Sequence, residues 1–446
     1  MIKTLKTMSK QDKERYTVPR KVQDVIPVRR IWPDGIFLTG NKFSKTYRFS
    51  DINYLVASRE DKESMFLIYS ELLNSLDSGA VTKITINNRR MNKANFEQSI
   101  LMPMQEDFRD EYRREYNQML LDKATGANGI TQEKYITISV VKKDIEEARA
   151  YFSRVGADLI SHFAALGSKC VELDASERLR ILHDFYRQGE EAEFSFDLAA
   201  KAKHGHDFKD YICPDSMEKN SDYLKLGDKF CRVLFLKDYA SYIKDNMVTE
   251  LLDSDTEAVL SVARKHMCQL AVLKFQQLDG LNTALPIGAR KINAFRTLTT
   301  ESLAVFIPFK VQEIQDKGGI YFGENAISHN LIMCNKANLL NQSSFYLGVP
   351  GAGKSFAVKE LIAFLMLHPD YAEDEILVCD PEGEFGALVK ALGREKATVA
   401  HLVAGGKDRL NAMYMVEGYG EQNPIVEKSQ FIMSLIEQID KRGVGP

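Results

Sequence analysis

A glycine-rich loop between a strand-like run and a helical run constrains the fold of this chain more than any other feature. Residues 344–347 have a strand pattern, residues 348–355 match G-x-x-x-x-G-K-[ST] in full, and a helical pattern covers 356–367. The glycines allow a tight turn whose backbone N–H groups point at phosphate oxygens, and the start of the helix adds a favourable dipole. The pattern therefore predicts a nucleotide site.

Two side chains of the loop carry most of this chemistry. Lys354 supplies a positive charge to the β- and γ-phosphates, and Ser355 supplies a hydroxyl group to Mg²⁺. The predicted nucleotide-binding residues are Gly348, Gly351, Ala352, Gly353, Lys354, Ser355 and Phe356.

A second strand-like run, residues 376–379, ends in two carboxylates near the loop in sequence, Asp380 and Glu382, which are candidates for the magnesium side of the site. Three interpretations stay open. In the first, the run is a Walker B strand, although Pro381 stands where motor ATPases carry a catalytic Glu. In the second, Asp380 begins the D-x-x-G of a GTPase, although no guanine-binding segment follows. In the third, the strand is accessory and Asp380 caps a helix over 384–392. No catalytic residue is assigned.

The composition is that of a globular protein. The chain has 446 residues, 44% of them hydrophobic, with 59 Lys and Arg against 62 Asp and Glu, which excludes disordered and collagen-like chains. No run reaches the roughly 18 apolar residues that a membrane-spanning helix needs. The six cysteines are scattered without a C-x-x-C pair, as in reduced cytosolic proteins. We therefore predict a cytoplasmic protein.

The sequence before the loop predicts a sheet covered by helices. A hairpin is expected around Gly40-Asn41, and the alternation of Ile136, Ile138 and Val140 predicts a strand. Predicted strands cover 36–38, 42–49, 81–86, 135–141, 231–236, 320–322 and 327–334, and predicted helices cover 61–73, 106–121, 145–166 and 254–278. This predicts an α+β N-terminal domain before the loop.

Two weaker features are assigned no chemistry. Residues 1–50 carry 12 Lys and Arg against 4 Asp and Glu, so that the basic end is either a solvated tail or an arm for anionic lipid or nucleic acid. His204, His206 and Cys213 are three potential zinc ligands, but a structural zinc site needs a fourth. We predict no metal site there.

Longer runs of the sequence resemble one family. They are SSFYLGVPGAGKSFAVKELI, ILVCDPEGEFGALVKALG, LNAM and NPIVEKSQFIMSLIEQI, with VQDVIPVRRIWPDGIF, LLDKATGANGI and ARKINAFRTLTTESLAVFIPF further upstream. These runs resemble the conjugal-transfer ATPases of type IV secretion systems, the TraE/TrbE/CagE class, in the form found on Gram-positive conjugative elements. The resemblance covers nearly the whole chain.

The resemblance implies a motor ATPase with a RecA-like P-loop domain that binds ATP and Mg²⁺. It also implies a homo-oligomer at the inner face of the cell membrane, with other secretion proteins as partners and DNA as an indirect substrate. The implied division is a basic arm (1–35), an α+β transfer-ATPase domain (36–245), a helical connecting region (246–318) and the first part of the ATPase domain (319–446). In this family the Walker B Asp and catalytic Glu come later, which favours the third interpretation of Asp380.

Two departures from the family set further expectations. The sequence reaches Pro446 before a Walker B strand, and the segment near Met247 to Asp253 is shorter than in such proteins. We therefore expect a P-loop strand that lacks a neighbour, and ATP binding without hydrolysis. The alternative is a non-enzymatic docking module for membrane secretion partners, in which the loop is vestigial.

Overall fold

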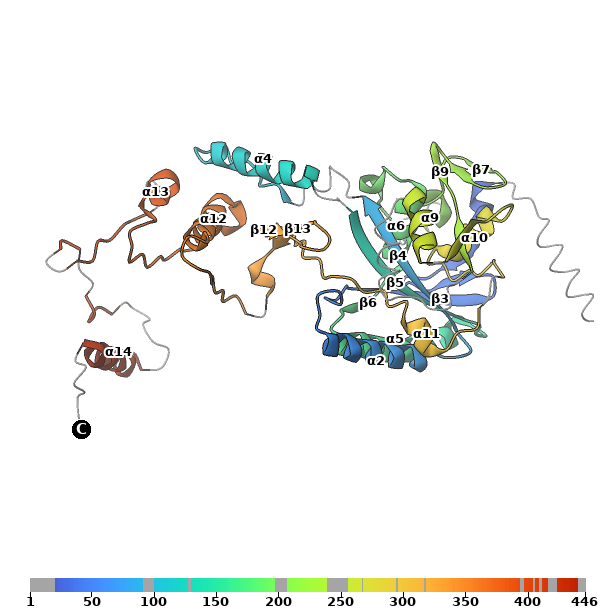
Figure 1. Cartoon of the computed structure of the whole chain (residues 1–446), viewed down its shortest axis with the longest axis horizontal. Helices are drawn as coiled ribbons and strands as arrows, with labels where there is room; N and C mark the ends of the chain where they lie inside the picture. Colours follow the sequence, from blue (N-terminus) through green and yellow to red (C-terminus); the bar gives the residue numbers. More distant parts are fainter. Residues whose placement is uncertain are drawn as a thin grey trace, which may run out of the picture. The chain divides into compact units, whose positions relative to one another are not determined.

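The chain folds into two compact units, and its described residues form both α and β structure. Unit 1 comprises Met1–Leu101 with Glu115–Gln342, and unit 2 comprises Met102–Arg114 with Ser343–Pro446. The computed structural model describes residues 21–90, 100–126, 130–196, 207–238, 256–266, 268–293, 296–316, 318–339, 341–393, 397–403, 406–408, 411–415 and 423–439 (Figure 1). His204, His206 and most of the basic arm lie outside these ranges. The four-part division of the sequence stays a prediction.

Unit 1 is built on a six-stranded antiparallel sheet. Its strands are β1 (Val28–Ile31), β2 (Phe37–Thr39), β3 (Lys42–Phe49), β5 (Ile130–Val140), β4 (Val81–Arg90) and β6 (Cys170–Glu172). The spatial order is β1-β2-β3-β5-β4, and β6 pairs with the end of β3. The predicted hairpin is confirmed, because β2 and β3 pair across the two-residue turn Gly40-Asn41, where Gly40 has a φ of +62°.

Alternation along the strands assigns each side chain to one face of the sheet. In β5, Ile136, Ile138 and Val140 are buried in the larger core, as the sequence predicts. The residues between them are polar and also buried: Thr137 and Ser139 face the opposite side of the sheet. Both faces of the sheet are therefore covered.

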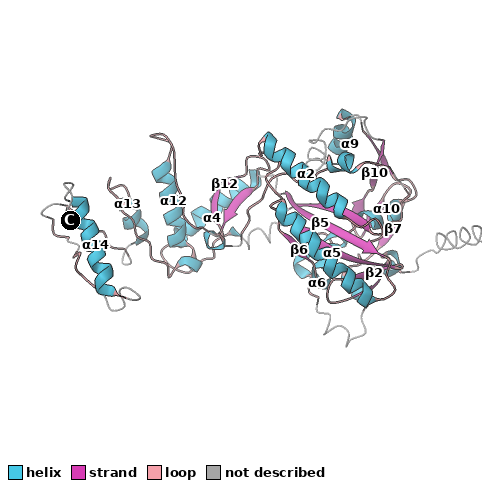
Figure 2. Ribbon diagram, turned by 90° about the horizontal axis from the view of Figure 1, so that it is seen from below, coloured by secondary structure: helices cyan, strands magenta, loops and turns pink. Residues whose placement is uncertain are grey.

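Two layers of helices provide that cover. Helices α2 (Arg59–Ser75) and α5 (Ile145–Ala165) pack side by side with α11 (Thr300–Ala304) on one face, while α6 (Ala175–Tyr186) and α10 (Gln277–Ala284) lie on the other (Figure 2). The first layer forms the larger core with Phe49, Phe163 and Phe309. The second forms a separate core with Leu179, Leu182 and Leu281.

Among its described residues, unit 1 has three smaller antiparallel sheets. Their strands are β7 (Met217–Lys219), β8 (Leu224–Leu226) and β9 (Lys229–Cys231); β10 (Leu234–Asp238) and β11 (Gln269–Val272); and β12 (Ile320–Glu324) and β13 (Leu331–Cys334). Short 3₁₀ turns cover Val22–Val25, Glu191–Glu193, Phe208–Tyr211 and Lys336–Asn338. Helix α4 (Asp110–Gly126) packs its later turns against β13 through Leu120.

Several expectations about unit 1 are wrong in detail. The strand predicted over 231–236 is divided, because β9 ends at Cys231 and β10 begins at Leu234. The helix predicted over 254–278 is instead α9 (Thr256–Lys265), β11 and the start of α10, because β11 finds its hydrogen-bond partners in β10. Gly280 lies inside α10, where a side chain would collide with Leu273 and Val233. Strand β4 continues past residue 86, where the predicted strand ends, because β5 offers partners along its whole length.

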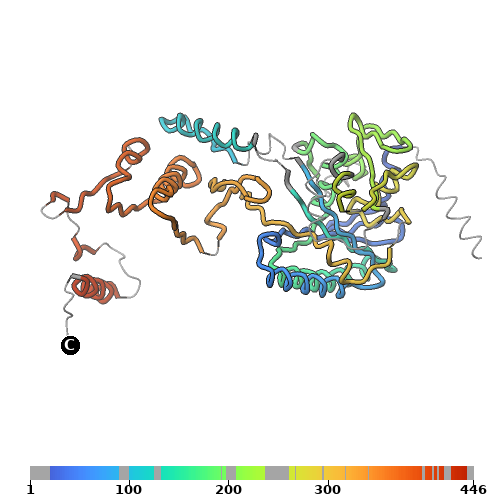
Figure 3. Tube along the Cα trace, viewed as in Figure 1, coloured from blue at the N-terminus to red at the C-terminus, as the bar shows by residue number. Residues whose placement is uncertain are grey.

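Unit 2 is helical in its described parts. It contains the first turn of α4, α12 (Lys354–Leu367), a 3₁₀ turn (Pro369–Tyr371), α13 (Gly386–Leu388) running into a π-helical turn (Val389–Gly393), and α14 (Pro424–Ile439) (Figure 3). The strands predicted over 344–347 and 376–379 are not formed, since neither segment pairs with a described strand. Among the described residues, no helix is both long and apolar enough to span a bilayer.

Candidate phosphate-binding loop

The glycine-rich loop leads directly into the first turn of α12. Gly351 and Gly353 have φ angles of +80° and +85°, in the left-handed region that favours glycine. Neither position is crowded, so backbone conformation rather than space requires a glycine there. Gly353 is the N-cap residue and supplies no side chain to the helix, which leaves its first N–H groups without a side-chain cap. An uncapped helix start of this kind attracts an anion.

Lys354 folds back over the loop. Its Nζ donates hydrogen bonds to the carbonyl oxygens of Gly348 (3.0 Å) and Val349 (3.2 Å), and the Ala352 N–H donates to the Val349 oxygen (3.1 Å). The loop therefore curls around the ammonium group. A phosphate placed at the helix start would exchange these carbonyl oxygens for more strongly charged ones.

The next two residues of α12 are open to solvent. Ser355 and Phe356 are exposed, and the Ser355 hydroxyl has no hydrogen-bond partner among the described residues. This hydroxyl is thus available as a magnesium ligand, which fits the donor type that Mg²⁺ prefers. The described part of the chain holds no group of three or more acidic, His or Cys side chains arranged to bind a metal.

Asp380 is held by backbone rather than turned to a ligand. Its two carboxylate oxygens accept hydrogen bonds from the N–H groups of Glu384 (3.1 Å) and Phe385 (2.9 Å). The bond from Phe385, followed by that from Glu384, keeps the pKa of the Asp380 carboxyl below its ordinary value. These bonds lie in the turn that precedes α13, so Asp380 accepts from N–H groups ahead of that helix rather than from those of its first turn. The Glu382 side chain is exposed and has no hydrogen-bond or ion-pair partner among the described residues.

The Asp380 turn is tied to α12 by one lysine. Lys359 Nζ lies 3.4 Å from a carboxylate oxygen of Glu384 and 5.4 Å from the ring centroid of Phe385. The structure therefore connects the middle of α12 with the acidic turn in unit 2 through residues outside the predicted nucleotide-binding set.

The other end of α12 is capped by residues that the sequence did not indicate. Arg113 Nε donates to the Leu367 carbonyl oxygen (2.8 Å), and Arg109 donates to that of Met366 (3.0 Å). Asp107 and Asp110 each accept a hydrogen bond of 2.6 Å from Arg113 and hold its guanidinium in place. Guanidinium groups satisfy the last carbonyls of a helix and complement its dipole. No local pattern could predict this contact, because Arg113 and Leu367 are 254 residues apart.

Comparison with known proteins leaves the family open. A scan against protein-family models finds no match for this chain. A search of the curated proteins finds no match either.

Proposed function

We propose that this chain is the ATP-binding subunit of a conjugal-transfer system of the type IV secretion class, and that residues 348–355 bind the nucleotide phosphates. The observation that carries the proposal is the full loop pattern at the start of α12, where Gly351 and Gly353 adopt left-handed backbone and the helix has no side-chain cap. The resemblance of longer sequence runs to that ATPase class supports it further.

Each residue of the loop has a role in this proposal. The backbone N–H groups around Gly351 and Gly353 donate to phosphate oxygens, and Lys354 turns from the Gly348 and Val349 carbonyls to the β- and γ-phosphates. Ser355 contributes its hydroxyl to Mg²⁺, which neutralises phosphate charge when bound.

The proposed arrangement around the loop is RecA-like. Residues 344–347, which form no strand among the described residues, would be the P-loop strand of that arrangement and would lack a neighbouring strand. Assembly into a homo-oligomer at the inner membrane face, together with other secretion proteins and a DNA substrate, belongs to the same proposal and rests on the resemblance in sequence.

Hydrolysis is not part of the proposal for this chain. Asp380 is occupied by two backbone N–H groups, and Glu384 is paired with Lys359, so neither carboxylate is set to activate a water molecule. We therefore expect binding of magnesium-ATP with little or no turnover.

The test measures magnesium-ATP binding by calorimetry and phosphate release on the purified chain and two variants. Lys354→Ala removes the loop cation, and Lys428→Ala removes the same charge from α14 as a matched control. We expect the parent chain to bind magnesium-ATP. Lys354→Ala should weaken this binding by at least about tenfold, because one charge-assisted hydrogen bond is lost, and Lys428→Ala should leave the affinity unchanged. Equal affinity of the parent chain and Lys354→Ala would contradict the proposal.

A second candidate is a docking module whose loop is vestigial. Its support is the exposure of large apolar side chains in unit 2: Phe345 is 88% exposed and Leu377 is 93% exposed. Exposed apolar surface of this kind is typical of protein interaction sites. The same titration separates the candidates, since the docking module requires no affinity for nucleotide.

A further inference from the structure

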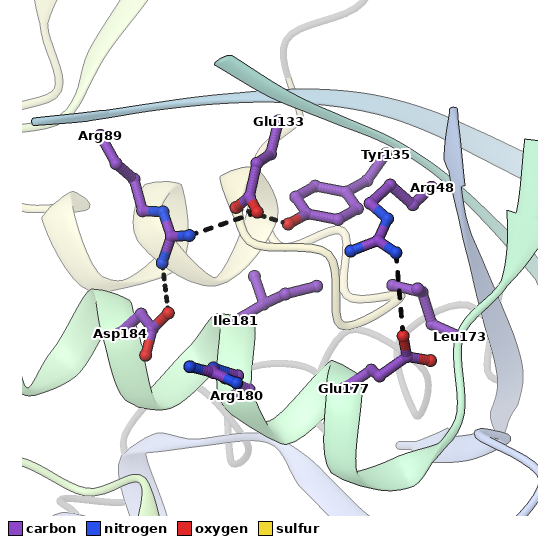
Figure 4. A pocket seen from close by; sticks show the side chains of 9 residues that line it. All are labelled: Arg48, Arg89, Glu133, Tyr135, Leu173, Glu177, Arg180, Ile181 and Asp184. Carbon is purple, nitrogen blue, oxygen red and sulfur yellow. Dashed lines mark hydrogen bonds and ion pairs between the residues drawn. The ribbon is translucent and has the colours of Figure 1, made fainter. Parts of the chain in front are cut away.

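A polar pocket in unit 1, remote in sequence from the loop, has a second arrangement suited to an anion. The pocket has a volume of about 210 Å³ and lies between α6 and the face of the large sheet (Figure 4). Glu177, Arg180 and Asp184 come from α6, at a spacing that places them on one side of the helix. The facing wall comes from β3, β4 and β5.

The inner half of the pocket is a closed ion network. Arg89 lies between Glu133, at 3.2 Å, and Asp184, with which it forms an ion pair. The Tyr135 hydroxyl donates to the second oxygen of Glu133 at 2.8 Å. Because Asp184 is almost fully buried and paired, this half offers little to a ligand.

The outer half has more positive than negative charge. Arg48, on β3, approaches Glu177 only to 4.0 Å, and both side chains are about half exposed. The other oxygen of Glu177 accepts the Asp174 N–H at 3.0 Å, in the capping box that starts α6. Arg180 is exposed and has no ion-pair or hydrogen-bond partner among the described residues. Arg48 and Arg180 therefore line the pocket from opposite walls, and Glu177, the carboxylate nearest Arg48, is already used by the helix cap.

We propose that Arg48 and Arg180 bind a phosphate group in this pocket, as inorganic phosphate or as part of a small phosphate ester. A guanidinium group presents several N–H donors in a planar fork that suits phosphate oxygens. A tetrahedral phosphate can accept from two forks on opposite walls at once, whereas a carboxylate presents its two oxygens in one plane. Leu173 and Ile181, which also line the pocket, give it apolar walls that reduce competition from water.

Binding of inorganic phosphate to the Lys354→Ala chain tests this site without the loop lysine. Arg180→Gln should weaken that binding by at least about tenfold, as expected for one charge-assisted hydrogen bond. The control is Arg59→Gln, which removes another exposed arginine, in the first turn of α2. Equal affinities of these two variants would overturn the proposal, as would the absence of phosphate binding in the Lys354→Ala parent.

A variant with the opposite expected effect excludes a purely structural role for the arginines. Glu177→Gln removes the competing charge beside Arg48 but keeps a capping-box side chain, since Gln serves at that position as well. We expect it to strengthen phosphate binding several-fold, and an unchanged or weaker affinity would contradict the proposal. Acetate is the comparison ligand: if it binds as tightly as phosphate, the assignment to phosphate is wrong. Inorganic phosphate and a sugar phosphate, titrated in parallel, distinguish the two sources.

Discussion

Strand-like sequence runs form strands in unit 1 but not in unit 2. In unit 1, strand-like runs bury their apolar side chains, and Tyr47 and Ile136 are fully inaccessible. In unit 2, the equally strand-like runs 344–347 and 376–379 leave Leu347 and Leu377 at least 90% exposed. The difference lies in partners, because every strand of unit 1 has a neighbour that satisfies its backbone hydrogen bonds.

Helices do not depend on partners in this way. Helix α12 forms in unit 2 although only Phe364 and Leu367 are buried, since its hydrogen bonds close within the segment. A strand pattern therefore predicts a strand only where another strand lies beside it. The predictions below test whether this contrast holds in solution.

The largest expected effect is in amide hydrogen exchange. Amides of β5 over 136–140 should exchange about a thousandfold or more slower than those of an unfolded chain, because they open only with the core of unit 1. Amides of 345–347 and 376–379 should exchange close to the unprotected rate. Mass spectrometry of peptides from the monomer measures both. Strong, uniform protection of 345–347 would mean that a partner strand exists.

The next effect is in thiol reactivity, which differs between the units. Cys379 is exposed in the 376–379 run, whereas Cys170 is buried in unit 1, where burial and then the charge of Glu172 raise the pKa of its thiol to about 12. Only the thiolate reacts, so Cys170 should stay unlabelled at pH 8 until the chain unfolds. A fast labelling phase is expected, which Cys379→Ser abolishes and Cys170→Ser leaves intact. Protection of Cys379 would place this run in a packed sheet.

A third test compares two phenylalanines by urea denaturation. Phe309 is fully buried, with ring centroids 5.7 Å from Phe49 and 6.4 Å from Phe163. Phe309→Ala should therefore lower the free energy of unfolding by about 3–5 kcal/mol. Phe345→Ala, the matched change at an exposed ring of unit 2, should alter it by less than about 0.5 kcal/mol. If the two changes lowered the free energy of unfolding by similar amounts, the contrast between a packed unit 1 and exposed runs in unit 2 would be wrong.

Short sequence patterns predicted those elements of unit 1 whose structure depends on neighbouring residues in the chain. The Gly40-Asn41 turn gave the β2–β3 hairpin its register, and the helical spacing of apolar residues placed α2 and α5 within a few residues. Helix 254–278 was predicted wrongly, because nothing near β11 indicates that β10 will pair with it.

The sequence predicted the position of the candidate loop but not the contacts that hold the helix after it. The pattern of glycines and Lys354 is contiguous, so the residues of the loop follow from the sequence alone. The contacts of Arg113 and Arg109 with the end of α12 join distant segments and left no local signal. The pocket residues of α6 do share one helix face in sequence, but only the fold shows that Arg48 lies opposite them.

The smallest expected effect concerns a buried cation in unit 1. Lys83 Nζ donates to the carbonyl oxygens of Leu285 (2.8 Å) and Ala289 (3.1 Å), without a carboxylate partner among the described residues. Nearby, Arg178 is buried and donates to the Pro286 oxygen at 2.8 Å. Burial, followed by the charge of Arg178, lowers the pKa of Lys83 to about 8 from an ordinary value of 10.5.

This pKa shift predicts how stability depends on pH. Below pH 8 the lysine is protonated in both the folded and the unfolded chain, and the cost of the buried charge is present in full. Between pH 8 and 10.5 the folded chain loses the proton while the unfolded chain keeps it, so stability rises with pH. The free energy of unfolding, taken relative to Lys83→Met, should rise by about 1–3 kcal/mol over this window. The comparison cancels the titration of buried thiols and tyrosines, which both proteins share, and a flat difference would show that Lys83 is as well solvated as the exposed residues of unit 2.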